Sequence, residues 1–247
     1  MALIADSRFK SAGRALLDVV FPRWCVECGS AVEAGSFQHV CGSCGDEITF
    51  SRAPHCETCG WPFPGEVIGA RQCPSCVDLE PEFDAGRTGM LLHGAARTFV
   101  HEMKYRGGWH LRGDLRMLVQ RMAGLRAFVH GAILVPVPLH PRRFRWRGFN
   151  QARWVADALA ADGGAAGVEE LLTRVKDTPT QTRLNREARE KNMRDAFELR
   201  AGAVASPECR YVLVDDVFTT GATLNECARV LRRAGVTQLG VASLGHG

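Results

Sequence analysis

Eight of the ten cysteines in this 247-residue chain fall into four Cys-x-x-Cys pairs. The pairs are Cys25/Cys28, Cys41/Cys44, Cys56/Cys59 and Cys73/Cys76. Two such pairs across a short hairpin supply four sulfurs to one tetrahedral zinc ion, with Zn–S distances of about 2.3 Å. Because sequential pairing closes only short loops, we expect the first two pairs to bind one structural zinc ion and the last two a second. The sequence therefore predicts a double zinc ribbon, with a cross-braced pairing as the alternative.

A redox dithiol is the other use of such a pair, but it requires a Cys-x-x-Cys that opens a helix in a βαβ unit. Here a glycine follows the second cysteine of three pairs, where a metal-binding knuckle needs a permissive backbone. His39 and His55 lie near the pairs, but the cysteine sets are already complete, so we expect neither histidine to bind metal. Cys227 lies on the apolar face of a predicted helix and is expected to pack as a small hydrophobic residue.

The composition, 46% apolar and 23% charged, is typical of a globular chain. No apolar run approaches the roughly 20 residues that span a bilayer, and charged residues interrupt the N-terminus, unlike a secretory signal. We therefore expect a cytoplasmic protein without membrane insertion. The net charge of +4 is unevenly divided, because residues 1–80 carry 6 basic and 10 acidic side chains, whereas residues 81–247 carry 25 and 17.

This change in composition predicts two domains: residues 1–80, with a short helix at 10–21 before the ribbons, and residues 81–247. In the second domain, apolar patterns typical of strands and of helices alternate, which predicts an α/β fold with a parallel sheet and helices on both faces. The expected strands are 90–92, 132–137, 171–175, 211–217 and 238–243. The expected helices are 95–105, 109–123, 150–161, 185–192 and 222–234.

The segment 211–224, YVLVDDVFTTGATL, joins a buried strand to a helix through a turn of small residues. Backbone N–H groups at a helix N-terminus form an anion site, and hydroxyl groups add donors. Asp215 and Asp216 stand at the carboxyl end of the strand, where open α/β sheets bind ligands. Paired carboxylates there suit ribose hydroxyls, directly or through Mg²⁺. An ordinary strand followed by a capped helix is the alternative, but it leaves the two adjacent acids unexplained.

This segment resembles the phosphoribosyl pyrophosphate (PRPP) motif of type I phosphoribosyltransferases. The resemblance implies a phosphoribosyltransferase-like sheet and PRPP bound with Mg²⁺. It gives Asp215 and Asp216 a catalytic role as well as a ligand-binding one. The remaining PRPP-binding residues that it implies are Thr219, Thr220, Gly221, Ala222 and Thr223. No P-loop and no Gly-x-Gly-x-x-Gly motif competes with this interpretation.

A strongly basic segment follows the strand expected at 132–137, and we expect it to form a loop. Arginines alternate with aromatic residues between His140 and Arg153, and no acidic residue interrupts them. By analogy with the corresponding loop of phosphoribosyltransferases, Arg142 and Arg143 are candidates for contacting pyrophosphate during catalysis. Arginine with aromatic residues also suits a single-stranded nucleic acid, for which the candidates are Arg142, Arg145, Trp146 and Arg147. A solvated loop with Trp146 and Phe149 packed inward is the alternative.

The cysteine pairs and three further segments, 101–107, 135–153 and 178–197, are similar to the ComF competence family, also described as the GntX type. The resemblance implies a PRPP-binding protein that handles single-stranded DNA during natural transformation, with the competence machinery as partner. An active phosphoribosyltransferase and a non-catalytic PRPP sensor are the alternatives. Residues 176–194 then correspond to a loop that closes over the reacting centre, or else form a polar helix. Lys104 and Tyr105 either contact the ligand or cover the edge of the sheet.

Overall fold

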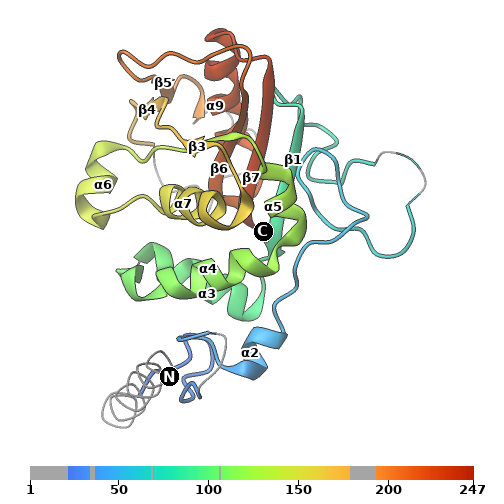
Figure 1. Cartoon of the computed structure of the whole chain (residues 1–247), viewed down its shortest axis with the longest axis vertical. Helices are drawn as coiled ribbons and strands as arrows, with labels where there is room; N and C mark the ends of the chain where they lie inside the picture. Colours follow the sequence, from blue (N-terminus) through green and yellow to red (C-terminus); the bar gives the residue numbers. More distant parts are fainter. Residues whose placement is uncertain (1–21, 34–36, 68, 70, 106, 179–192) are drawn as a thin grey trace, which may run out of the picture.

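The computed structural model describes residues 22–33, 37–67, 69, 71–105, 107–178 and 193–247. Its centre is a five-stranded sheet in which every pair of neighbouring strands is parallel (Figure 1). The strands lie in the order β1 (Ala85–Leu91), β7 (Gln238–His246), β6 (Arg210–Phe218), β2 (Ile133–Pro136) and β3 (Gly167–Val168). The predicted α/β fold with a parallel sheet is therefore confirmed.

Side chains of the central strands alternate between two apolar clusters, one on each face of the sheet. Val212 and Val214 face the first cluster, whereas Tyr211 and Leu213 face the second. The helices that contribute to the first cluster are α3 (Gly94–Tyr105), α4 (Arg112–Arg121), α5 (Ala123–Val129) and α7 (Gln151–Gly163). Helix α9 (Ala222–Arg233) packs into the second cluster. Helices thus cover both faces, as predicted.

The two cysteine-rich segments join different clusters. Cys25 and Cys44 belong to the first cluster, and the short helix α2 (Gly42–Asp46) lies beside the layer that contains α3 and α4 (Figure 1). Cys56, Cys59, Cys73 and Cys76 belong to the second cluster. The segment between the ribbons also runs antiparallel to β1, because Ser51 N donates to Gly89 O at 2.9 Å. The otherwise unpaired edge of β1 is thereby covered.

Several elements differ from the sequence prediction. The expected helix 109–123 is a 3₁₀ turn (Gly108–Leu111) followed by α4, and it breaks at Met122 before α5. The expected strand 171–175 is β4 (Leu172–Arg174), which pairs antiparallel with β5 (Phe197–Leu199) outside the main sheet. The short strand β3 was not predicted. The helices expected at 10–21 and 185–192 lie outside the described residues.

The basic segment after β2 was predicted to be a loop, and that prediction is wrong. It forms the helix α6 (Pro141–Arg147), in which the side chain of His140 accepts a hydrogen bond from Arg142 N as the N-cap. Proline at the first helical position and Gly148 at φ 79° after the last are the usual signals of a helix start and stop. None of the described helices is long and apolar enough to cross a membrane.

Candidate functional site

The eight paired cysteines form two four-sulfur clusters, and in each cluster the four Sγ atoms lie within 4.8 Å of one another. The first cluster is Cys25, Cys28, Cys41 and Cys44, and the second is Cys56, Cys59, Cys73 and Cys76. Tetrahedral zinc with Zn–S bonds of about 2.3 Å requires sulfurs roughly 3.8 Å apart. The Sγ atoms of Cys28 and Cys41 are 3.7 Å apart, and those of Cys59 and Cys73 are 3.5 Å apart. The geometry fits structural zinc in both clusters, with the predicted sequential pairing.

His39 serves to attach the first ribbon to the α/β layer. Its backbone N–H donates to Asp114 Oδ2 at 2.7 Å, and its ring Nδ1 lies 3.2 Å from the same oxygen. Gln38 N donates to Asp114 Oδ1 at 2.6 Å. Asp114 on α4 is completely buried, so its carboxylate depends on these donors for compensation. The prediction that His39 and His55 are not ligands is consistent with the complete cysteine sets.

The second ribbon lies directly on β1. Thr88 Oγ1 donates to Cys59 O at 2.8 Å, and Gly86 N donates to Glu57 O at 2.9 Å. A Cβ atom added to Gly60, whose φ is 80°, would lie 2.7 Å from Arg87 Cα. The backbones of the ribbon and the strand therefore touch without side chains between them, which only glycine permits.

The predicted phosphate motif forms the end of β6, a turn and the start of α9. Asp215 and Asp216 are within β6, Thr219 and Thr220 form the turn, and Gly221 precedes α9 with a φ of 76°. A small hollow is lined by Asp215 and residues 217–224. The N-terminus of a 12-residue helix faces this turn, so unpaired N–H groups are available to an anion.

The side of Gly221 that lacks a side chain faces inward. A Cβ atom there would lie 2.8 Å from Phe218 Cζ and 3.1 Å from Leu79 Cδ2. The resemblance implies that Gly221 binds PRPP, and the structure gives it a packing role as well. A larger residue would disturb the turn itself, so substitution of Gly221 does not test ligand contact alone.

Lys104, at the last turn of α3, forms an ion pair with Asp216, with Nζ 3.0 Å from Oδ1. Burial lowers the pKa of Lys104, but the carboxylates of Asp216 and Asp215 more than offset this, and the net pKa is raised. Burial, together with repulsion from Asp216, raises the pKa of Asp215 to about 7. The two carboxyl groups therefore share a single neighbouring cation, Lys104.

A cavity of about 290 Å³ opens between this acid pair and helices α6 and α7. Its polar lining includes both acids, Lys104, Thr219 and Thr223, together with Arg143, Arg147, Asn150, Gln151 and Arg174. These residues come from α3, α6, α7, β4, β6 and α9, and they meet at the carboxyl edge of the sheet, the usual ligand position in this architecture. Of the predicted motif, Asp215, Asp216, Thr219 and Thr223 line this cavity, whereas Thr220, Gly221 and Ala222 line the small hollow.

Three residues that line the cavity each have a buried side-chain N–H group with no acceptor among the described residues: Arg147 Nε, Gln151 Nε2 and Arg174 Nε. Gln151 is 1% exposed and Arg174 is 7% exposed. The orientation of the Gln151 amide is fixed, because its Oε1 accepts from Arg147 Nη1 at 2.7 Å. Burial lowers the pKa of both arginines, yet a guanidinium stays charged. Unsatisfied buried donors are costly, so this wall of the cavity suits a ligand that offers only acceptors.

The four arginines of α6 divide into two pairs. Arg143 and Arg147 line the cavity, and Arg143 Nη2 donates to Thr178 O. Arg142 is 79% exposed, outside the cavity lining, and pairs with Asp177 at 3.4 Å. Arg145 is exposed as well. Of the two arginines predicted to contact pyrophosphate, the structure brings only Arg143 to the cavity.

Several aromatic side chains lie on α6 or near it, and one of them, Tyr105, also lines the cavity. Trp146 is 70% exposed, whereas Phe149 is buried and stacks on Trp154 at a ring distance of 3.9 Å. Two further exposed rings were not predicted as nucleic-acid contacts: Tyr105, over which Arg147 lies at 5.4 Å, and Trp109 at 54% exposure. Nothing in the sequence around Trp109 predicted that its ring would pack against Trp154 on α7.

Gln151 and Arg174 were also missed. Arg174 ends β4, in the small second sheet, and Gln151 opens α7, so only the tertiary fold brings their side chains together. A polar residue at the first turn of a helix is ordinarily exposed, and sequence periodicity therefore gave no reason to select Gln151.

Comparison with known proteins agrees with the two four-cysteine clusters. The family described as Double zinc ribbon domain matches residues 16–77. Competence protein F of Haemophilus influenzae is 28% identical over 88% of this chain and 94% of its own length. DNA utilization protein YhgH of Salmonella typhimurium is 29% identical, covering 82% and 88%. Competence protein ComFC of Streptococcus pneumoniae is 27% identical, covering 76% and 86%.

Fold and sites together define a class of protein: a parallel α/β sheet with a polar cavity at its carboxyl edge and two four-cysteine clusters packed into the apolar clusters on opposite faces. The first two relatives match 88% and 82% of the chain, which is far more than the ribbons alone. These similarities, together with the matched ribbon, support a ComF family protein with an N-terminal double zinc ribbon.

Proposed function

We propose that this protein binds PRPP together with Mg²⁺ and serves the handling of single-stranded DNA in competence. The observation that carries the PRPP part is the wall of unsatisfied N–H donors beside an acid pair and a helix N-terminus. A ligand that satisfies the whole site must offer anionic acceptors to the donors and hydroxyls to the acids. A phosphorylated ribose with a pyrophosphate group has both.

Each part of the cavity has a partner in such a ligand. The turn before α9 takes the 5′-phosphate, through backbone N–H groups and the hydroxyls of Thr219, Thr220 and Thr223. Asp215 and Asp216 accept hydrogen bonds from the ribose hydroxyls. Arg147, Arg174 and the Gln151 amide donate to the pyrophosphate at the far wall. The predicted catalytic role of Arg143 is retained in this proposal, and that of Arg142 requires a movement of its side chain from Asp177.

Magnesium fits the same site through carboxylate oxygens. Asp215 and Asp216 are hard oxygen ligands, and Mg²⁺ commonly binds one or two carboxylates and completes its shell with water and substrate phosphates. Bound there, the ion would neutralise the leaving pyrophosphate. The protein itself contributes the orientation of the sugar and the exclusion of water.

The PRPP proposal is tested by titration calorimetry with PRPP, ribose 5-phosphate and inorganic phosphate. The double variant Asp215→Asn, Asp216→Asn keeps the side-chain size but removes both charges. We expect it to lose the Mg²⁺ dependence of PRPP binding and to weaken PRPP at least about tenfold. Phosphate alone should bind it nearly as it binds the parent. A folded double variant that binds PRPP like the parent would refute this site.

The far wall is tested separately. Gln151→Leu removes one unsatisfied donor, but it also removes the acceptor of Arg147 Nη1, so it should destabilise the fold by about 1–3 kcal/mol. We expect it to weaken PRPP more than ribose 5-phosphate, since only PRPP carries the pyrophosphate. If both ligands are weakened equally, the Gln151 amide does not contact the pyrophosphate group. Release of pyrophosphate in the presence of an acceptor distinguishes an active transferase from a PRPP sensor.

The DNA part of the proposal is supported by the names of the relatives, Competence protein F, DNA utilization protein YhgH and Competence protein ComFC. It is also supported by the exposed face of α6, where Arg142, Arg145 and Trp146 offer cations and a stacking surface. Arg147 lies at the cavity end of the same helix. This arrangement suits a single strand whose phosphates follow α6 toward the cavity.

Binding of a fluorescent oligonucleotide at several salt concentrations tests this surface. Arg142→Ala with Arg145→Ala should weaken binding and flatten the dependence of log K on log salt by up to about 0.7 per lost phosphate contact. Trp146→Ala should weaken binding with little change of slope, because stacking releases few ions. Arg233→Ala, an exposed cation on α9, is the control. If the double variant binds like the parent at every salt concentration, the DNA surface is not α6.

A further inference from the structure

We propose that the linker 77–84, which leaves the second zinc ribbon at Cys76, positions the phosphate-binding turn, so that the second zinc ion is required for ligand binding and the first is not. This inference rests on the proposed function, since it assigns a control element to the same site. It concerns Leu79, Glu82 and Asn225 as positioning residues, none of which lines the main cavity.

Leu79 of the linker packs against the phosphate-binding turn. Leu79 N donates to the carbonyl of the zinc ligand Cys76 at 3.1 Å, so Leu79 is held one turn beyond the metal cluster. Its side chain is buried, and it lies against the open side of Gly221, 3.1 Å from the position of a Cβ atom there. Any shift of Leu79 would therefore be transmitted to the turn at Gly221, because protein cores are closely packed.

A second path runs from the ribbon to the same turn through aromatic rings. Trp61, within the second ribbon, contacts the ring of His246 edge to face at 4.7 Å. His246 in turn stacks on Phe218 at 5.1 Å. Phe218 ends β6 and lies under Gly221. The turn thus rests on side chains that come from, or are braced by, the second ribbon.

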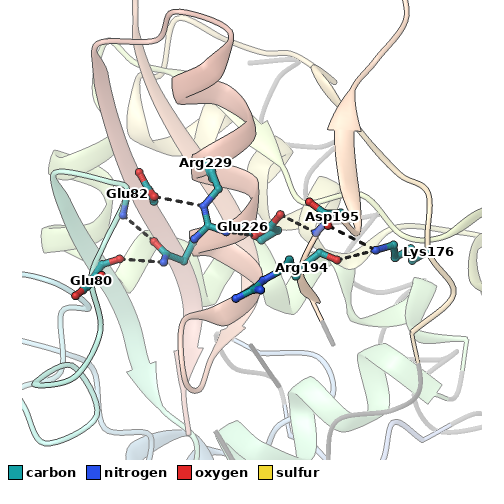
Figure 2. Close-up of polar contacts among 8 residues, drawn as sticks. Glu80, Glu82, Lys176, Arg194, Asp195, Glu226 and Arg229 are labelled. Carbon is teal, nitrogen blue, oxygen red and sulfur yellow. Dashed lines mark hydrogen bonds and ion pairs between the residues drawn. The ribbon is translucent and has the colours of Figure 1, made fainter. Parts of the chain in front are cut away.

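The linker also fastens the helix that begins at this turn (Figure 2). The side chain of Asn225 on α9 bonds the linker backbone twice: its Oδ1 accepts from Glu82 N at 2.7 Å, and its Nδ2 donates to Glu80 O at 3.0 Å. Arg229, one turn further along α9, pairs with Glu82 at 3.3 Å. These contacts fix the first two turns of α9 relative to the linker.

Glu226 links the same helix to residue Asp195. It is 6% exposed, its Oε2 lies 2.8 Å from Arg229 Nη1, and its Oε1 accepts from Asp195 N at 2.9 Å (Figure 2). Lys176 bonds the neighbouring carbonyl of Arg194 at 2.9 Å. The start of α9 is consequently held between the linker and residues 194–195.

Among the residues that the structure describes, none links the first ribbon to the phosphate-binding turn in a comparable way. This ribbon attaches through Asp114 on α4 and packs into the apolar cluster on the other face of the sheet. Its sulfurs are also more accessible, since Cys28 is exposed whereas all four cysteines of the second cluster are buried. The two zinc ions are therefore expected to differ both in how readily they leave and in what their loss does to the ligand site.

Loss of the second zinc ion should weaken ligand binding because the phosphate-binding turn is then no longer held in its binding conformation. Without metal, the second ribbon no longer fixes Cys76, and the linker gains freedom that ligand binding must then remove. The backbone N–H groups of the turn bind phosphate well only when they are held in one direction. We expect ribose 5-phosphate to bind at least about tenfold more weakly after loss of the second zinc, and within about twofold of the parent after loss of the first.

The test combines metal analysis with calorimetric titration of ribose 5-phosphate into the full-length protein. Cys73→Ser and Cys25→Ser should each lose one zinc ion. Only Cys73→Ser should bind ribose 5-phosphate at least about tenfold more weakly than the parent. Asn225→Ala should keep both zinc ions, and it should weaken ribose 5-phosphate by about threefold to tenfold by freeing α9 from the linker. Arg233→Ala, on the same helix, is the matched control. Circular dichroism confirms that each variant is folded.

The outcomes separate the coupling from the proposed function. If the parent does not bind ribose 5-phosphate, the proposed function fails, and the coupling fails with it. If the parent binds and folded Cys73→Ser binds equally well, only the coupling is refuted. Should Cys73→Ser not fold, Asn225→Ala decides: with two zinc ions and parental affinity it refutes the positioning role, and with weakened affinity it supports it.

Discussion

Replacing Lys104 with methionine removes the cation of the Lys104–Asp216 ion pair while keeping the length of the side chain. At 3.0 Å and an effective dielectric constant of about 20, the charges attract by roughly 5 kcal/mol before desolvation is counted. Removing one partner of a buried pair typically costs about 3–5 kcal/mol. Because the Lys104 side chain is 23% exposed, we expect a loss of about 2–3 kcal/mol in the free energy of unfolding at pH 8.

The loss should depend on pH in a definite direction. At pH 8 the carboxylate of Asp215, whose pKa is about 7, is ionised in the parent and loses its neighbouring cation when Lys104 is replaced. At pH 5.5 Asp215, whose pKa is raised to about 7, already holds a proton in the parent, so less charge is left uncompensated. We therefore expect a loss of only about 1 kcal/mol at pH 5.5.

Urea unfolding of Lys104→Met and of the parent at the two pH values measures this difference. The double variant Lys104→Met, Asp216→Asn is the control, because it removes both charges and should be less destabilised at pH 8 than the sum of the single variants. The lysine variant should also bind Mn²⁺ more tightly than the parent, since the carboxylates have lost their own cation. An equal loss at pH 5.5 and pH 8 would refute the electrostatic reasoning.

Three further predictions follow from features described above. Metal analysis of the reduced protein should give two zinc ions per chain, and a value of zero or one would contradict the double ribbon. Between about pH 5.5 and 7 the free energy of unfolding should fall as pH rises. The reason is that Asp215 holds a proton in the folded chain, whereas in the unfolded chain, where its pKa is about 3.9, it has released that proton. Asp215→Asn should remove this part of the pH dependence. Asp114→Ala should leave the two N–H donors of the first ribbon without their acceptor and destabilise the chain by about 2–4 kcal/mol, measured by urea unfolding against the exposed control Arg233→Ala.

Local patterns in the sequence predicted the parts of the site that local geometry builds. The spacing of the cysteine pairs was enough to predict both clusters, since each closes over a short stretch of chain. The strand, turn and helix from 210 to 233 were predicted within a residue or two, because a buried apolar run followed by Thr-Thr-Gly-Ala-Thr permits few alternatives.

Features that depend on contacts between distant segments were missed. The strand predicted at 171–175 forms as β4, but its antiparallel partner β5, only three residues long, was missed, and with it the small second sheet. The start of β1 was missed because Gly86 and Gly89 interrupt its pattern, although both are needed where the strand touches the ribbon and α5. The pairing of Lys104 with Asp216, and the unsatisfied donors of Gln151 and Arg174, require the finished fold.

The position of β7 has a consequence for synthesis of the chain. This strand is the last of the described strands to leave the ribosome, yet it lies between β1 and β6, and it pairs with both along nearly its full length. The edge strand β1 therefore emerges more than a hundred residues before its neighbour exists. Until residues 238–246 are translated, β1 and the second ribbon have no sheet to join, and their apolar surface stays open to chaperones or to other nascent chains.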